Sequence, residues 1–285
     1  MNCSLKYIKP FHICKILRSI IIQLAAQMPC YKKYWLKPLH YCNISYSMKG
    51  FLFLALLIFS TANAQQTAGN YQFKKNIFLV STPISASVLG FSLYKQAHIK
   101  NTTQPEILLL NRQQINAFDR IATHQWQPNT AKASDILALS TTLLPLLFLT
   151  HEHSKKDFFK IANVSFQSFL LSQALCNSVK LTKINRPFLY NEKVPMAEKL
   201  NKENNLSFFS GHTTWASSMC FSTAFAFQTY NPKTKATPYI FAAAATLPAI
   251  QAFMRVRAGK HYPSDVIVGY LVGLGSSFLM HRLHL

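Results

Sequence analysis

Long uncharged runs recur along the chain beyond residue 65 and give the first indication of its fold. Six such runs are 15 to 19 residues long: 77–94, 136–150, 161–179, 213–230, 236–254 and 266–280. With their flanking residues, most reach the roughly 20 residues that a helix needs to cross a bilayer. They also lack the polar stripe that a helix of a soluble bundle turns to water, although a buried soluble bundle is the alternative. The pattern predicts an all-α fold, a polytopic transmembrane helical bundle of five or six spans.

The first of these runs gives the weakest signal for a span. Residues 77–94 contain a proline, a glycine and several hydroxyl side chains. The segment that follows, residues 95–135, is polar, with an apolar rhythm at Ile115, Phe118 and Ile121. This rhythm fits a helix lying at the membrane interface, and a solvated loop fits it equally well.

The amino-terminal region carries the features of a secretory signal peptide. The stretch MKGFLFLALLIFSTANAQQ begins at Met48 and has a basic start, an apolar core and an Ala62-Asn63-Ala64 cleavage pattern. This order predicts a signal peptide over residues 48–64, a mature start near Gln65 and Met48 as the initiator. Residues 1–47 would then be an upstream extension without a structural role. An uncleaved anchor is the alternative interpretation.

The composition supports a membrane protein with an anionic partner. Charged residues make up 14% of the chain, against about 25% in soluble domains, and the net charge is +21. An excess of positive charge suits nucleic acid, an anionic bilayer surface or a phosphorylated substrate. The sequence shows no helix-turn-helix pattern, zinc-finger spacing or ribonucleoprotein motif, so we expect no nucleic-acid partner. Cys176 and Cys220 lie in apolar runs, where we expect packing rather than a disulfide framework or a metal site.

Polar functional groups gather at the ends of four of the apolar runs. If the runs are consecutive spanning helices, their alternation of direction brings these four ends to one face of the membrane. The residues are Lys180 and Arg186 after the third run, Ser210, Gly211 and His212 at the start of the fourth, Arg255 at the end of the fifth, and His261 and Asp265 before the sixth. One pocket would then hold two imidazoles, one carboxylate and three cationic side chains.

These residue types suit phosphate chemistry. Arginine offers a planar fork and lysine a compact charge to phosphate oxygens, and the N–H groups of Ser210 and Gly211 at a helix start form an anion seat. His261 and Asp265 are four residues apart, so the carboxylate can hold one imidazole nitrogen and leave the other free to attack. His212 could protonate the leaving oxygen and then activate water. We expect neither a metal ion nor a cofactor for this reaction.

Three segments resemble the signature motifs of the type 2 phosphatidic acid phosphatase (PAP2) family, which also includes bacterial acid phosphatases and vanadium haloperoxidases. They are KLTKINRPF at 180–188, FSGH at 209–212 and RVRAGKHYPSD at 255–265. The family patterns are K-x6-R-P, P-S-G-H and S-R-x5-H-x3-D. The resemblance implies that His261 is the nucleophile forming a phosphohistidine, with Asp265 as its orienting partner and His212 as the acid and base. It also implies phosphate binding by Lys180, Arg186, Ser210, Gly211 and Arg255.

The sequence departs from the family patterns at three points. Phe209 replaces a proline, which matters little because only the backbone shapes that turn. Met254 replaces the serine before the arginine of the third motif and removes a hydroxyl near the phosphate. Lys180 stands one residue closer to the arginine of the first motif than the pattern expects, so Lys183 is the alternative phosphate donor.

The motifs together predict a membrane-embedded, metal-independent phosphatase that acts on lipid phosphomonoesters or pyrophosphates and leaves the acyl or prenyl tail in the bilayer. The sequence does not choose among phosphatidic acid, phosphatidylglycerol phosphate, undecaprenyl pyrophosphate and lipid A phosphates. The alternatives are a vanadate-dependent haloperoxidase and a non-catalytic protein that binds or transports an anionic lipid.

The expected location is the bacterial cytoplasmic (inner) membrane, crossed several times. Lysines in the short loops 151–160 and 231–236 favour these loops on the cytoplasmic side and the active site on the periplasmic face. After a cleaved signal peptide, five spans also put the active site outside the cytoplasm, whereas six spans would put it on the cytoplasmic face, which is the alternative. We expect the extension and signal peptide over residues 1–64, a first weak span and an interfacial segment over 65–135, and a PAP2-type catalytic helical domain over 136–285.

Overall fold

The computed structural model describes residues 72–150 and 152–285, and every element of secondary structure in these residues is a helix. The expected extension and signal peptide lie outside the described residues. Six long helices account for most of the described chain: α3 (Lys75–Ala97), α6 (Pro128–Thr141), α8 (Phe158–Val179), α10 (Gly211–Tyr230), α11 (Thr237–Arg257) and α12 (Pro263–His284). Each uncharged run falls in one of them, and the second run continues past α6 into the 3-10 helix η4 (Leu144–Thr150). The all-α fold class is confirmed.

Four helical stretches in the described part of the chain are long and apolar enough to cross a membrane: α3, α6 continued through η4, α11 and α12. The first of them contains the run with the weakest sequence signal. α8 and α10 have the length of a span but carry more polar side chains, many of which are buried against other helices. Cys176 in α8 and Cys220 in α10 are free and buried, as expected of packing residues. The chain is a multi-pass membrane protein.

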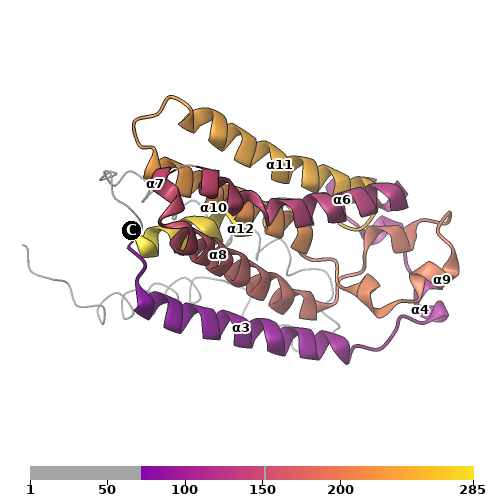
Figure 1. Cartoon of the computed structure of the whole chain (residues 1–285). Helices are drawn as coiled ribbons and strands as arrows, with labels where there is room; N and C mark the ends of the chain where they lie inside the picture. The colour runs from indigo at the N-terminus through magenta and orange to yellow at the C-terminus, as the bar shows by residue number, and fades with distance from the viewer. Residues whose placement is uncertain (1–71, 151) are drawn as a thin grey trace, which may run out of the picture. The chain divides into compact units, whose positions relative to one another are not determined.

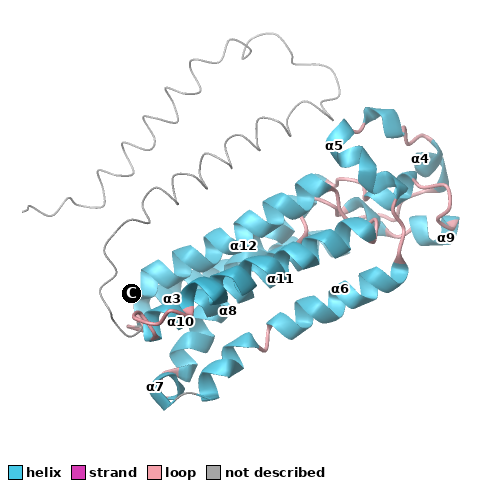
Figure 2. Cartoon of the chain, turned by 90° about the horizontal axis from the view of Figure 1, so that it is seen from above, coloured by secondary structure: helices cyan, strands magenta, loops and turns pink. Residues whose placement is uncertain are grey.

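α10 lies at the centre of the bundle. It packs against α12, α11, α8 and α6, while α3 packs against α8 (Figures 1 and 2). The contact with α12 is close because two of its glycines, four residues apart, face α10. An added Cβ would lie 2.7 Å from Ser210 O at Gly269 and 2.5 Å from Thr214 O at Gly273. This small-residue packing face sets the start of α10 beside the start of α12.

Serine hydroxyls also join α10 to α12. Ser217 donates a hydrogen bond to Tyr270 O at 2.7 Å, and Ser277 donates to Ser218 O at 2.7 Å. A side-chain hydrogen bond between membrane helices contributes about 0.6 kcal/mol on average. Together with the glycine contacts, these bonds favour one register of the two helices over others.

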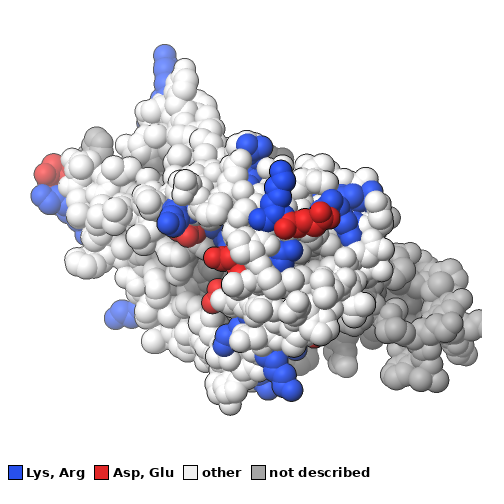
Figure 3. All heavy atoms as spheres, turned by 90° about the vertical axis from the view of Figure 1, so that its right-hand side faces the viewer, with Lys and Arg blue, Asp and Glu red and all other residues white. Residues whose placement is uncertain are grey.

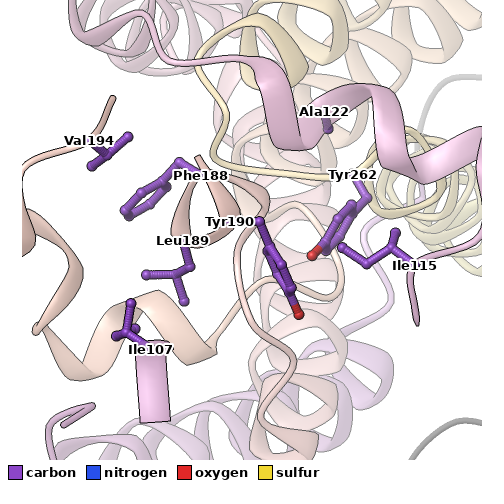
Figure 4. Packing of buried hydrophobic residues seen from close by; sticks show 8 residues of the cluster. All are labelled: Ile107, Ile115, Ala122, Phe188, Leu189, Tyr190, Val194 and Tyr262. Atoms are coloured by element: carbon purple, nitrogen blue, oxygen red, sulfur yellow. The ribbon is translucent and has the colours of Figure 1, made fainter. Parts of the chain in front are cut away.

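Short helices and loops cover the end of the bundle where α8 ends and α10 begins, and we call this layer the roof. It consists of α4 (Gln104–Leu108), η2 (Arg112–Gln114), α5 (Ala117–Arg120), η3 (Ile121–His124), η5 (Lys180–Thr182), η6 (Pro187–Tyr190), α9 (Met196–Lys199) and η7 (Lys202–Asn205). A cluster of buried side chains lies within it: Ile107, Ile115, Ala122, Phe188, Leu189, Tyr190, Val194 and Tyr262 (Figure 4). Of the apolar positions noted in the 95–135 segment, Ile115 is buried in this cluster, whereas Phe118 and Ile121 are exposed. The short helix α7 (Glu152–Lys155) lies between η4 and α8.

Candidate active site

The four polar clusters predicted from the sequence meet at the end of the bundle that the roof covers. Lys180 follows α8, Ser210 precedes α10, Arg255 lies in the last turn of α11, and Asp265 lies in the first turn of α12. α8 and α11 run toward this end and α10 and α12 run away from it, so the expected alternation of direction brings all eight predicted residues together. Seen from this end, the surface has a hollow with acidic and basic side chains at its edge (Figure 3).

His261 and Asp265 form a buried pair. His261 Nδ1 lies 3.4 Å from Asp265 Oδ2, and each residue has only 1% of its surface exposed. The same carboxylate oxygen accepts hydrogen bonds from Ser207 Oγ at 2.6 Å and from the backbone N–H of Tyr262 at 3.0 Å. The carboxylate therefore holds Nδ1 of His261, and Nε2 is the nitrogen left for chemistry. The sequence analysis missed Ser207 because no motif spacing distinguishes it from the other polar residues before α10.

The surroundings of His261 keep its imidazole neutral. Burial lowers its pKa well below the usual value of 6.5, and the positive charges of Arg255, Arg186 and Lys180 lower it further. A positive charge on His212 would act on it in the same direction. A neutral imidazole retains the lone pair that nucleophilic attack requires.

Lys180 lies against the first residue of α10. Its Nζ is 3.3 Å from the point that a Cβ on Gly211 would occupy, so any side chain at Gly211 would press on the ammonium group. Burial lowers the pKa of Lys180, and the charges of Arg186 and Arg255 lower it further. Lys183, the alternative donor, is exposed at the end of η5. The geometry favours Lys180 as the lysine of this site, despite its shorter spacing to Arg186.

Ser210 caps α10. Its hydroxyl oxygen accepts a hydrogen bond from the backbone N–H of Thr213 at 3.4 Å and lies 2.9 Å from Thr213 Oγ1. The backbone N–H of Ser210 donates to Asp265 O at 3.1 Å, so it is not available to a phosphate oxygen as we expected from the sequence. The N–H groups of Gly211 and His212 come next, and they have no acceptor within the helix. The anion seat at this helix start therefore lies one residue further along the chain than expected.

α6 contributes a carboxylate to the site. Asp135 Oδ1 lies 2.9 Å from Arg255 Nη1 and 3.0 Å from His212 Nε2. Arg255 Nη1 also donates to Ser134 Oγ at 2.8 Å. The Arg255 side chain is 5% exposed, whereas that of Asp135 is 55% exposed. The sequence analysis did not single out Asp135, because it lies on a helix separate from the three motifs and no spacing pattern connects it to them.

The roof joins the loops of the first and third motifs. Arg186 N donates a hydrogen bond to Asn204 O at 2.7 Å, and Phe188 N donates to Gly259 O at 3.0 Å. Gly259 has a φ of 71°, and an added Cβ would collide with Gln125 O. This turn of the third motif therefore requires a glycine.

Two further contacts of the roof support the third motif. At the start of α12, Asp119 accepts hydrogen bonds from Ser264 N at 2.9 Å and from Ser264 Oγ at 2.8 Å. Lys260 Nζ lies 5.4 Å from the ring centre of Trp126 and 4.7 Å from that of Phe188. Burial, followed by the charges of the two site arginines, lowers the pKa of Lys260 to about 8. Lys260, which the sequence analysis did not single out, therefore adds positive charge beside the site at neutral pH.

Comparison with known proteins agrees with the motifs. Residues 164–285 match the family model of the PAP2 superfamily, and this range contains all eight predicted site residues. Among solved structures, the chain is similar to the crystal structure of a transmembrane PAP2 type phosphatidylglycerolphosphate phosphatase from Bacillus subtilis. The two chains are 15% identical, the match covers 84% of this chain and 96% of that chain, and the TM-score is 0.42. A comparison with curated proteins found no match. The region of this membrane protein from residue 164 to residue 285 belongs to the PAP2 superfamily.

Proposed function

We propose that this protein is a membrane-embedded, metal-independent phosphatase that hydrolyses lipid phosphomonoesters or pyrophosphates through a phosphohistidine intermediate. The family match supports a phosphatase-type activity. The observation that carries the proposal is the buried pair of His261 and Asp265, which lies within the field of Lys180, Arg186 and Arg255. A neutral nucleophile beside three cations suits attack on a phosphate dianion, because the cations offset repulsion and stabilise the charge that develops in the transition state. These side chains supply both the nucleophile and the electrostatic stabilisation, so the reaction needs no metal ion.

The reaction proceeds in two displacements at phosphorus. In the first, His261 Nε2 forms a bond to phosphorus as the bond to the leaving oxygen breaks, and His212 gives a proton to that oxygen. In the second, His212 takes a proton from water, and the water oxygen attacks the phosphohistidine and releases inorganic phosphate. Asp265 stabilises the positive charge on the His261 ring through Nδ1 in both steps.

Four of the five remaining predicted residues bind the non-bridging phosphate oxygens. Lys180, Arg186 and Arg255 supply positive charge, and the backbone N–H of Gly211 donates from the start of α10. Ser210 contributes by capping this helix. Its own backbone N–H donates to Asp265 O and is therefore not available to the phosphate.

A lipid substrate suits the position of the site. The site lies where long apolar helices end, so a phosphorylated headgroup can reach His261 while its tail stays in the bilayer. Phosphatidic acid, phosphatidylglycerol phosphate, undecaprenyl pyrophosphate and lipid A phosphates all combine a terminal phosphate with an apolar tail. A panel of these four compounds distinguishes among them by the rate of phosphate release.

The decisive comparison is phosphate release from this panel, in detergent, by the wild type and by His261→Gln. Loss of the nucleophile should lower turnover by about a thousandfold or more. His281→Gln is the matched control, because His281 is also buried but lies near the other end of α12. Unchanged release by His261→Gln would rule out the proposed mechanism. Vanadate should inhibit phosphate release, and chelators should not. Halide oxidation with vanadate present would instead support the haloperoxidase, and lipid binding without turnover would support the non-catalytic lipid-binding protein.

We further propose that the protein lies in the bacterial cytoplasmic membrane and that the site faces the periplasm. We also propose that residues 136–285 form its catalytic domain, to which the part of α6 before residue 136 adds Asp135. Glu198 is exposed in α9 of the roof, and the two native cysteines of the described residues, Cys176 and Cys220, are buried; Cys3, Cys14, Cys30 and Cys42 are replaced by serine for the test. A Glu198→Cys variant should therefore react with an impermeant maleimide in intact cells. Protection that disappears on permeabilisation would place the site in the cytoplasm.

A further inference from the structure

Asp135 contacts two groups to which the proposed reaction gives a role at the phosphate. Its Oδ1 lies 2.9 Å from Arg255 Nη1 and 3.0 Å from His212 Nε2. In the proposed reaction the first of these groups binds the phosphate and the second faces the leaving oxygen. A phosphate oxygen and the Asp135 carboxylate would therefore compete for the same two donors.

Two features set Asp135 apart from Asp265, the other carboxylate of the site. Asp265 is 1% exposed and its carboxylate accepts from Ser207 and from the Tyr262 N–H, so its position is fixed by buried hydrogen bonds. The Asp135 side chain is 55% exposed, and it contacts two site residues that would face the substrate, His212 and Arg255. A solvated carboxylate can leave these partners by a rotation of its own side chain at little desolvation cost.

We propose that Asp135 is a displaceable internal anion, which occupies the phosphate seat in the free protein, is expelled by substrate and returns when inorganic phosphate leaves. This inference rests on the proposed function, because it assigns the seat to phosphate. Asp135 also lies outside the region that matches the PAP2 family, so the device belongs to α6 of this chain rather than to the three motifs. It keeps a strongly cationic site from retaining its product.

A seat without this carboxylate would bind phosphate more tightly. Lys180, Arg186 and Arg255 would then face the product with one negative charge fewer beside them, and the nearby Asp265 is engaged with His261. Removal of one nearby negative charge strengthens binding of an anion, and the effect weakens as salt screens it. The competing role, a fixed orienting partner for His212, predicts the opposite: a lower kcat with no change in phosphate affinity.

The test is binding of inorganic phosphate and of orthovanadate to the full-length protein in detergent, measured by calorimetry, together with KM, kcat and product inhibition. Asp135→Asn keeps the size of the side chain and should tighten binding of both anions by about tenfold or more, lower KM and strengthen product inhibition. Asp135→Ala should do the same. Asp157→Asn is the matched control. Asp157 pairs with Lys160 at 2.6 Å and lies at the start of α8, whereas the site lies beyond the end of that helix.

Each result decides between these roles. Tighter anion binding by both Asp135 variants, but not by Asp157→Asn, supports the displaceable anion. Unchanged anion affinity with a lower kcat overturns it and favours the orienting role. If neither the wild type nor any variant binds phosphate or vanadate, the assignment of the seat is wrong, and the proposed function is overturned with it.

Discussion

Replacement of Gly273 by alanine tests the packing that sets α10 beside α12. An added Cβ would lie 2.5 Å from Thr214 O, 2.6 Å from Ser217 Cβ and 2.8 Å from Ser218 N. These atoms are part of the α10 backbone or attached directly to it, so no side-chain rotation relieves the overlap and the helices must move apart. Overpacking of this kind costs about 1–3 kcal/mol. The better helix propensity of alanine offsets about 1 kcal/mol of that loss.

Gly275 provides the matched control on the same helix. A Cβ at Gly275 has no atom within 4 Å. Gly275→Ala should therefore gain the helix-propensity term alone, about 0.5–1 kcal/mol. Because both variants share that term, the difference between them isolates the packing cost at Gly273, about 1–3 kcal/mol.

Thermal unfolding in detergent, followed by circular dichroism, measures this difference. For a domain of this size the midpoint moves by about 2–4 °C per kcal/mol, so Gly273→Ala should unfold several degrees below Gly275→Ala. Its phosphatase activity should also fall, because a wider gap between the two helices separates His212 from His261. Equal unfolding temperatures for the two variants would refute the close contact between α10 and α12.

Three further predictions concern the chemistry of the site. Ser207→Ala removes a hydrogen bond to the Asp265 carboxylate worth about 1.5–3 kcal/mol, so kcat should fall by about tenfold or more while vanadate affinity is kept. An unchanged kcat would exclude a positioning role for Ser207. Only neutral His261 can attack, and its pKa is lowered, so the acid limb of the pH profile of kcat/KM should lie below pH 6.5. Because the charge of Lys180 lowers that pKa, the limb should move to higher pH in Lys180→Gln, whereas a limb set by substrate ionisation would not move. The pKa of Lys260 is lowered to about 8, so anion binding should weaken as the pH rises through 8, and Lys260→Arg should prevent that weakening. If anion binding weakens equally in the wild type and in Lys260→Arg, another group is responsible.

The helices and the gathering of the motif residues could be predicted because both depend on local patterns. Uncharged runs of sufficient length mark helices in a bilayer whatever their neighbours are. The alternation of direction between consecutive helices then places residues such as Lys180, His212 and Arg255 at one end of the bundle. The choice of Lys180 over Lys183 needed the structure, because only the packing against Gly211 separates two lysines three residues apart.

The residues that the sequence did not reveal act through contacts between distant segments. Asp135 reaches the site from α6, whose charged residue could equally have faced water. Ser207 matters because its hydroxyl meets a carboxylate 58 residues away. The expected role of the Ser210 N–H also failed for a tertiary reason, since this N–H donates to Asp265 O, a carbonyl 55 residues away along the chain. Such contacts depend on the register of α10 and α12, which no local pattern specifies completely.

The covalent intermediate on His261 is the central claim, and trapping it is the most direct test. Wild type and His261→Gln are mixed with a substrate labelled at its phosphate, quenched in alkaline detergent and digested to peptides. We predict a label on the peptide that contains His261, stable in alkali, lost in acid and absent from His261→Gln. Label on a different residue, or undiminished turnover by His261→Gln, would contradict the account.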